Sequence, residues 1–298
     1  MKRVVSVSLG SSSRDHEATI ELLGQTINIQ RIGTDGDPRR AQALYEELDG
    51  NVDCLGVGGA VLTIATSRHS YPLTSAQRLV RNVRHTPVVD GDGFKSVMER
   101  QIAATLEAEI GPPAARRVLI PSAMDRMDMA RSFAAAGYEL IIGDFGFNLG
   151  LPIPLRSIPA LERVAALIVP IVRHLPMSML YPTGTREDVN EPRFTSWFEW
   201  ASVIAGDCNY ITHHMPTDMA GKIVATNTTT ERDVALFRQR GVTHLITSTP
   251  RIAGRTFGTN VMEAVLVALA GKGHPLDEPE MRALLEELGW KPNVEPLQ

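Results

Sequence analysis

A lysine and two aspartates in the segment TPVVDGDGFK form the first pattern that could do chemistry. Asp90-Gly91-Asp92-Gly93 ends a predicted strand, and Lys95 opens a predicted helix. At this spacing Lys95 could lie beside Asp90 or Asp92, and a carboxylate that orients an ammonium can help it to pass a proton to or from a substrate hydroxyl. These three residues are therefore the catalytic candidates. A polar turn with Lys95 in solvent is the simpler explanation of the same residues, and the Walker A pattern is not met.

A second pattern could bind an anion. The segment STPRIAGRTFGTNVMEA places two arginines and a glycine turn before a predicted helix. Free N–H groups at a helix N-terminus attract negative charge, and arginine adds paired donors. The anion-binding candidates are Arg251, Arg255, Gly258, Thr259 and Asn260. Asn260 and Glu263 also resemble a capping box, so an ordinary capped loop is the alternative.

Small polar residues follow several predicted strands of the second half of the chain. In open parallel sheets, ligands bind outside the carboxyl ends of the strands. The cofactor-binding candidates at these ends are Ser122, Asp144, Asn227, Thr228, Ser248 and Thr249. Asp144 follows Ser122 by 22 residues, where an acidic residue could hold a ribose hydroxyl. For any single residue, a turn or a helix cap is an equally simple explanation.

Other reactive residues predict no metal site and no serine nucleophile. His213 and His214 lie on a predicted strand, where neighbours point to opposite faces, and the two cysteines, Cys54 and Cys208, form no CxxC pair. The GxSxG elbow is absent, so the serines at 11–13 predict a turn. The glycines of GVGGA predict a tight turn rather than a dinucleotide fingerprint.

The elements that must position these residues predict two α/β units. Residues 1–111 read as an α/β domain with hairpins, including one that turns at Gly24 and a helix that begins after Asp37-Pro38. Gly111-Pro112-Pro113 is the best linker candidate. A long helix is expected just before it, at about 94–110. Short apolar strands then alternate with helices over 116–274, with a helix expected at 194–206 and a strand at 209–216, which indicates a doubly wound, Rossmann-like parallel sheet. Residues 275–298 read as a short helix and a tail.

Composition narrows the classes of function. The chain has 298 residues, a net charge of −4 and 43% hydrophobic residues, and no basic stripe of the kind that nucleic-acid binders show. The longest apolar run, 164–172, is too short to span a membrane, and the N-terminus lacks a signal-peptide pattern. We therefore expect a cytoplasmic protein with a small-molecule partner, binding neither nucleic acid nor membrane. The apolar helices at 158–173 and 260–270 could form core or a homodimer face, with core the simpler choice.

Several strings resemble a bacterial family labelled quinate/shikimate 5-dehydrogenase-like. They are VSVSLGSS, VVDGDG, GDFGFNLGLPIPLRS, LPMSMLYPTG, GKIVATNTTTERDV and TPRIAGRTFGTNVMEA. The resemblance covers most of the chain and implies a two-domain oxidoreductase that uses NAD or NADP on a small hydroxylated ring acid. Lys95 would then be the acid/base and Asp144 a contact of the cofactor ribose. The TxPxK lysine, the NTD aspartate and the glycine turn of true shikimate dehydrogenases are not matched here. The alternative is a non-redox transferase or lyase that binds a phosphorylated or nucleotide-bearing ligand.

Overall fold

The computed structural model describes residues 1–65, 70–175, 190–252 and 255–298, and its chain forms two compact units. Unit 1 contains Met1–Val97, Ala166–Thr183 and Ile252–Trp290, and unit 2 contains Met98–Ala165, Gly184–Arg251 and Lys291–Gln298. Each unit is therefore assembled from three separate stretches of sequence. The sequence predicted instead the continuous domains 1–111, 116–274 and 275–298.

Unit 1 is built on a five-stranded sheet of order β2-β3-β1-β4-β7. The strands are β1 (Lys2–Ser8), β2 (His16–Leu22), β3 (Gln25–Gly33), β4 (Cys54–Gly58) and β7 (Val88–Val89). All neighbouring strands are parallel except β2 and β3, which form the predicted antiparallel hairpin. The other elements assigned within this unit are the 3-10 turn η1 (Ser12–Arg14), β5 (Thr63–Ala65), β6 (Ser70–Pro72), β14 (Arg255–Thr256), α1 (Pro38–Leu48), α2 (Thr74–Val80), α12 (Thr259–Ala270) and α13 (Glu278–Glu287).

Helix α1 covers one face of this sheet and begins as the sequence predicts. The Asp37 side chain accepts hydrogen bonds from the N–H groups of Arg39 and Arg40, and Pro38 occupies the first helical position. The buried Tyr45 of the same helix donates its hydroxyl to the carbonyl oxygens of Val7 and Gly56, in β1 and β4. The helix is therefore held to the sheet by hydrogen bonds as well as by apolar packing.

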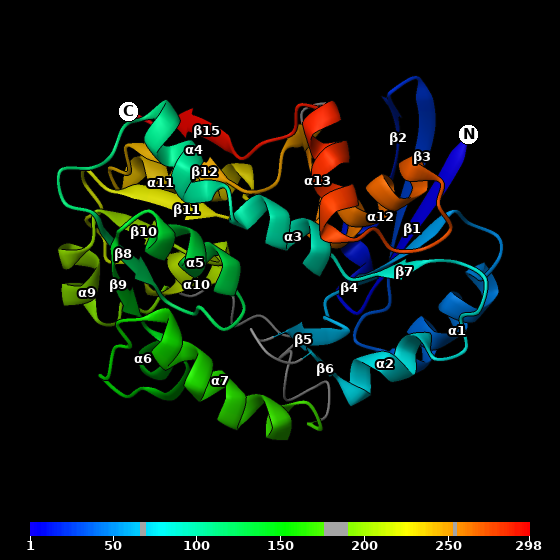
Figure 1. The fold of residues 1–298 in the computed structure, drawn as a ribbon, viewed down its shortest axis with the longest axis horizontal. Coiled ribbons are helices and arrows are strands. Elements are labelled where there is room, and N and C mark those ends of the chain that lie inside the picture. The colour runs from blue at the N-terminus through cyan, green and yellow to red at the C-terminus, as the bar shows by residue number, and fades with distance from the viewer. Residues whose placement is uncertain (66–69, 176–189, 253–254) are drawn as a thin grey trace. The chain divides into compact units, whose positions relative to one another are not determined.

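Helix α12 packs on β1, β3, β4 and β7, so this late segment completes the first unit (Figure 1). Every residue from Val261 to Leu269 is buried, which is the pattern of a helix covered on all sides. The prediction that this apolar helix is core is confirmed. The sequence placed this helix in the second domain, whereas it belongs to unit 1, because its apolar side chains pack against the strands of the unit 1 sheet.

Unit 2 is a six-stranded sheet of order β15-β12-β11-β10-β8-β9, parallel except for β15. Its strands are β8 (Arg117–Ile120), β9 (Glu139–Ile142), β10 (Val203–Ala205), β11 (Ile223–Thr226), β12 (His244–Thr247) and β15 (Asn293–Pro296). Its helices are α4 (Ile102–Glu109), α5 (Met127–Ala135), α6 (Asp144–Leu149), α9 (Thr195–Trp200), α10 (Cys208–His214) and α11 (Glu231–Gln239). Three of the unit boundaries fall within α3 (Asp92–Glu99), within α7 (Ile158–Val172) and within β13 (Arg251–Ile252).

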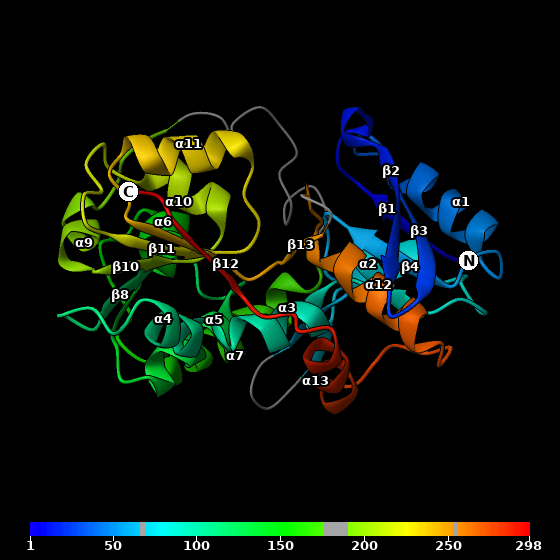
Figure 2. The same ribbon diagram turned by 90° about the horizontal axis from the view of Figure 1, so that it is seen from above.

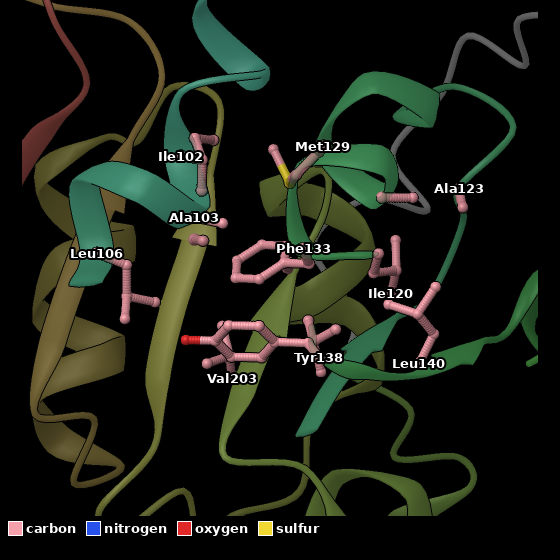
Figure 3. Packing of buried hydrophobic residues seen from close by; sticks show 14 of the residues in the cluster. Ile102, Ala103, Leu106, Ile120, Ala123, Met129, Phe133, Tyr138, Leu140 and Val203 are labelled. Atoms are coloured by element: carbon pink, nitrogen blue, oxygen red, sulfur yellow. The ribbon is translucent and has the colours of Figure 1, made fainter. Parts of the chain in front are cut away.

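Helices cover both faces of the unit 2 sheet, which makes it the doubly wound, Rossmann-like sheet that the sequence predicts. Alternate strand residues enter two separate cores: Leu119 and Ile204 join the core with α10 and α11, whereas Ile120 and Val203 join the core with α4 and α5. Figure 2 shows α10 and α11 on one face, and α4 and α5 on the other. Phe133 and Tyr138 meet edge to face in the second core, with ring centroids 5.1 Å apart (Figure 3).

Four local predictions are corrected by the structure. The single helix expected at about 94–110 is broken between α3 and α4, where Ser132 Oγ donates to the Arg100 carbonyl and accepts from the Ala103 N–H. The stretch expected to be helical through 201–206 contains β10, and the stretch expected to be a strand at 209–216 is mostly α10. The tail forms β15, which pairs with β12.

Candidate functional site

The carboxyl edge of the unit 2 sheet contains a topological switch point. Strand order runs from β8 to β9 on one side and from β8 to β10, β11 and β12 on the other. The loops that leave β8 and β10 therefore turn to opposite faces of the sheet, and ligands of open α/β sheets bind at such a point. Ser122 follows β8, Asp144 follows β9 and Asp207 follows β10. The structure thus brings two of the predicted residues to one edge and adds Asp207.

A chain of hydrogen bonds crosses this edge from the surface to a buried carboxyl. The Tyr210 hydroxyl donates to Asn148 Oδ1 at 2.9 Å, and Asn148 Nδ2 donates to Ser122 Oγ at 3.4 Å. Ser122 in turn hydrogen-bonds to Asp144, which also accepts the N–H groups of Ala123 and Met124. Tyr210 and Asn148 are exposed, so the outer end of this chain faces solvent.

Charge at this edge is predominantly negative. Burial raises the pKa of Asp144, although its backbone donors oppose that shift. Partial burial, together with the carboxylates of Asp207, Asp125 and Asp144, raises the pKa of the Tyr210 hydroxyl. The hydroxyl therefore stays protonated near neutral pH and remains a hydrogen-bond donor.

A buried arginine holds the carboxylate of Asp207. Arg126 donates to Glu99 Oε1 and to Asp207 Oδ2, each at 2.8 Å, and its side chain is 7% exposed. Burial by itself lowers the pKa of Arg126, but the carboxylates of Asp125, Glu99 and Asp207 raise it above the usual value. Asn227 Nδ2 donates to the same Asp207 oxygen at 2.9 Å. Hydrogen bonds from Arg126 and Asn227 therefore fix the orientation of the Asp207 carboxylate.

Acidic side chains lie at or near the N-termini of three helices that begin along this edge. Asp207 accepts the Asn209 N–H at the start of α10, and Thr230 with Asp233 forms a capping box at the start of α11. Asp144 lies in the first turn of α6. A phosphate would meet these carboxylates where it usually meets free N–H groups, so the edge is better suited to neutral hydroxyls than to anions.

Hydroxyl groups follow β11 and β12 farther along the same edge. Among the described residues, Thr229 Oγ1, Ser248 Oγ and Thr249 Oγ1 are buried and have no hydrogen-bond partner. The predicted residues Ser248 and Thr249 therefore lie at the expected place, beside the end of β11, because Thr226 and Thr247 are paired in register. Thr228 is half-buried.

The catalytic candidates lie in unit 1, where β7 leads into α3. Lys95 Nζ lies 2.8 Å from Asp92 Oδ1, so the predicted contact between them is present. Asp90 accepts the N–H groups of Leu62 and Asp92, and burial raises the pKa of its carboxyl. The role of this pair in catalysis stays a prediction.

The anion candidates near α12 have a different arrangement from the predicted capping box. The N-terminal cap is Gly258, Asn260 Nδ2 donates to Ser6 Oγ at 2.7 Å, and Glu263 Oε2 accepts the N–H groups of Gly93 and Phe94. The capping-box alternative is therefore wrong, because Glu263 is directed at the start of α3. Thr259 is half-buried. The side chains of Arg251 and Arg255 lie outside the described part of the chain.

Close packing explains one glycine of the DGDG motif. A Cβ on Gly91 would lie 2.3 Å from the Asn260 backbone nitrogen, and the residue has a φ of +93°. Only glycine fits this approach of the β7–α3 turn to the start of α12.

The sequence prediction placed the histidine pair wrongly and missed four residues of the site. His213 and His214 end helix α10 rather than a strand. Arg126, Asn148, Asp207 and Tyr210 were not predicted. One signal was present, because VIAGD at 203–207 repeats the pattern of LIIGD at 140–144, an apolar run followed by Gly-Asp.

Two searches of the described residues were negative. No group of three or more His, Cys, Asp or Glu side chains in the described ranges could hold a metal ion. Within the same ranges, no helix has the length and apolar character that a membrane crossing needs.

Comparisons with known proteins find two family models. One, described as "Domain of unknown function (DUF8754)", matches residues 93–297, and another, "Domain of unknown function (DUF8753)", matches residues 3–90. No curated protein matches.

Solved structures match at low identity. A periplasmic ribose ABC transporter protein from Conexibacter woesei DSM 14684 is 9% identical, with 97% of this chain and 96% of that chain covered and a TM-score of 0.42. A malic enzyme from Entamoeba histolytica is 12% identical (95% and 61% covered, TM-score 0.44). An ABC transporter solute-binding protein from Bacillus halodurans C-125 with bound myo-inositol is 11% identical (95% and 96% covered, TM-score 0.40).

These comparisons correct the sequence-based identification. The resemblance to quinate/shikimate 5-dehydrogenases is wrong, because the matching family models are domains of unknown function and the matching structures include sugar-binding transporter proteins. The predicted NAD(P)-dependent oxidoreductase is withdrawn on the same findings. The predicted cytoplasmic location is contradicted by the periplasmic description of matching structures. NAD or NADP as a ligand stays a prediction.

Proposed function

We propose that this chain, which belongs to the family described as "Domain of unknown function (DUF8754)", binds a neutral, hydroxyl-rich small molecule reversibly and without redox chemistry. The proposal rests on the geometry of unit 2. The ligand binds at the switch point between β8 and β10. The observation that carries this proposal is the exposed Tyr210–Asn148–Ser122 hydrogen-bond chain beside the fixed carboxylate of Asp207.

The donors and acceptors at this point suit ligand hydroxyls. The side chain of Asp207 is 22% exposed and accepts hydrogen bonds, while Asn148 offers both an amide donor and an acceptor. The exposed ring of Tyr210 adds an apolar face for the C–H side of a polyol. A carboxylate ligand or a phosphate would be repelled by Asp125 and Asp207, whereas neutral hydroxyls can use them as acceptors.

Calorimetric titration with matched ligands tests this proposal. We expect at least one neutral compound among D-ribose, D-glucose, D-galactose and myo-inositol to bind, and the corresponding sugar phosphates to bind at least tenfold more weakly. NADH and NADPH are titrated in the same series, which tests the predicted cofactors directly. Binding of the phosphates in preference to the neutral sugars, or of none of the neutral compounds, would contradict the proposal.

Substitutions at the edge locate the site. Asn148→Ala and Tyr210→Ala each remove one ligand contact, so we expect each to weaken the affinity roughly 5- to 10-fold, the equivalent of about 1 kcal/mol. Asn82→Ala is the matched control, because Asn82 is an exposed asparagine of unit 1 that hydrogen-bonds only to Glu46 among the partners described. Unchanged affinity in both variants would show that the ligand binds elsewhere.

A further inference from the structure

Exposed apolar side chains of unit 2 lie beside the candidate site. Among the described residues of this unit, the large apolar side chains that are exposed are Leu149, Leu151, Ile153 and Tyr210, with exposed fractions of 61%, 47%, 54% and 38%. Tyr210 donates its hydroxyl to Asn148, and Leu149 follows Asn148 directly in the chain. Two of the four side chains therefore adjoin the hydrogen-bond chain of the switch-point site.

The loop after α6, residues 150–155, is fixed at both ends. At its start, the Leu151 N–H donates to the Phe145 carbonyl and folds the chain back onto α6. At its end, Leu155 exchanges two backbone hydrogen bonds with Ile142, the last residue of β9. The loop is therefore attached to the same helix and strand that hold Asn148.

Two prolines stiffen the middle of this loop. Pro152 and Pro154 flank Ile153, and each fixes its own φ at about −65°. The apolar side chains are therefore held in place before a ligand arrives, and little conformational freedom is lost when they are covered.

The loop carries no charge, in contrast to the acidic edge beside it. No charged residue occurs between Asp144 and Arg156. The edge presents the carboxylates of Asp125, which is exposed, and Asp207, which is partly exposed. Exposed apolar side chains that gather in one place mark a binding surface. A ligand that uses both surfaces therefore has a neutral polar part and an apolar part.

We propose that Leu149, Leu151 and Ile153 form an apolar subsite, which receives the alkyl or aryl group of a neutral glycoside whose sugar binds at the switch point. This inference rests on the proposed function and deepens it, since it makes the preferred ligand an uncharged glycoside rather than a free sugar. The alkyl or aryl group gains affinity by leaving water and needs no hydrogen-bond partner. A free sugar would leave the three side chains exposed.

Calorimetric titration with matched glycosides tests the subsite. Methyl, hexyl and phenyl β-D-glucopyranoside, and the three corresponding β-D-galactopyranosides, share a neutral sugar and differ only in the apolar group. A fully buried methylene strengthens binding by a factor of about four, so burial of two of the five methylenes that hexyl adds to methyl gives roughly tenfold or more. We expect the hexyl or the phenyl glycoside of at least one sugar to bind at least tenfold more tightly than its methyl glycoside, with a more negative heat-capacity change.

Two substitutions of exposed apolar side chains by a small polar one locate the subsite. Leu149→Ser and Ile153→Ser should each reduce the ratio of hexyl to methyl affinity, or of phenyl to methyl affinity, roughly 3- to 5-fold. Leu167→Ser is the matched control, because Leu167 is a 75% exposed leucine of α7 in the part of that helix that belongs to unit 1. The control should leave the ratio unchanged, and circular dichroism with a Tm measurement checks that all three variants are folded.

The results separate this inference from the proposed function. Equal affinities of the three glycosides of each sugar, or an undiminished ratio in both Leu149→Ser and Ile153→Ser, overturn the apolar subsite and leave the switch-point site intact. A dimer of the unaltered protein that both variants lose would assign the side chains to contact with a second copy of the chain and would also overturn the inference.

Two further outcomes bear on the switch-point site itself. A reduced ratio in both serine variants, with no effect of Asn148→Ala or Tyr210→Ala on any affinity, supports the apolar subsite and contradicts the switch-point site. Absence of binding by every sugar and every glycoside overturns both.

Discussion

Glu263 shows how one buried side chain can connect charge to stability. Its carboxyl is almost completely buried in unit 1 and accepts two N–H groups at the start of α3. Burial, with a further contribution from the charges of Asp90 and Asp92, raises its pKa to about 7. The ammonium of Lys95 is paired with Asp92, and its charge lowers the pKa of the neighbouring Asp90, against the effect of burial.

The raised pKa predicts a pH dependence of stability. Between the ordinary value of 4.5 and about 7, folded protein binds more protons than unfolded protein, so the free energy of unfolding falls as pH rises through this window. Glu263→Gln keeps an oxygen acceptor and removes the charge. We expect urea unfolding of this variant to show a flatter profile and about 1–3 kcal/mol more stability than the unaltered protein at pH 8.

The raised pKa of Asp90 acts in the same direction, so part of the slope should remain in the variant. Glu287→Gln is the control, because Glu287 is exposed on α13. An identical pH profile for Glu263→Gln and the unaltered protein would show that Glu263 is not protonated on folding.

At the scale of elements, the β2–β3 hairpin shows how local sequence determines a turn. Leu23 and Gly24 connect the strands with φ values of 47° and 72°. Positive φ at both central residues defines a type I′ turn, which favours Asn-Gly and matches the twist of the strands. Leucine at the first of these positions is strained, and its side chain is 46% exposed. The turn was predictable from Gly24, although the strain at Leu23 was not.

Substitutions in this turn should shift stability in opposite directions. Leu23→Asn is expected to raise the free energy of unfolding by about 0.5–1 kcal/mol, because asparagine tolerates the left-handed region. Gly24→Ala should lower it by about 1 kcal/mol. No atom lies within 4 Å of the place a Cβ would take at Gly24, so this variant measures backbone conformation alone. Urea unfolding midpoints check both, and a loss of stability in Leu23→Asn would refute the assignment of strain.

Local sequence patterns predict a helix or strand well where its stabilising contacts come from residues close to it in sequence. The cap at Asp37, the hairpin at Gly24 and the strand–helix alternation of unit 2 were all expected and are present. Strand β10 was missed because it has three residues and follows the aromatic helix α9. Strand β15 was missed because only its pairing with β12 makes it a strand.

The sequence predicted the edge of the sheet at which the candidate site lies, but not how the side chains of the site are paired. Strand-end positions identified Ser122, Asp144, Asn227, Ser248 and Thr249 as neighbours of the sheet's carboxyl edge. Which of them point outward depends on contacts distant in sequence: Asp144 turns toward the N–H groups of Ala123 and Met124, and Arg126 connects Glu99 with Asp207. No local pattern encodes such pairings.

At the scale of the whole molecule, the two units share one chain in alternating stretches. Unit 1 begins at Met1 but obtains α12 from residues 259–270, and unit 2 obtains β15 from residues 293–296. The matching family models divide the chain near residue 90 instead. The family models cover continuous stretches of the chain, whereas the compact units group residues that pack together, so the two divisions differ.

This arrangement predicts how fragments behave. Residues 1–111 expressed alone lack the helix that buries β1 and β4, so we expect no cooperative thermal unfolding and no fixed near-ultraviolet signal. Joining residues 252–290 to this fragment through a Gly-Ser linker should restore cooperative unfolding. A cooperative transition for residues 1–111 alone would contradict the dependence on α12.

The late position of α12 has a consequence for synthesis on the ribosome. The five strands of the main unit 1 sheet are complete at residue 89, whereas α12 ends at residue 270. At about 5–20 residues per second, roughly 10–35 s pass before the helix that covers these strands has been made. During that time the nascent chain presents an apolar sheet face to solvent. We infer that a chaperone attending this interval would affect the yield of folded protein more than one acting after release.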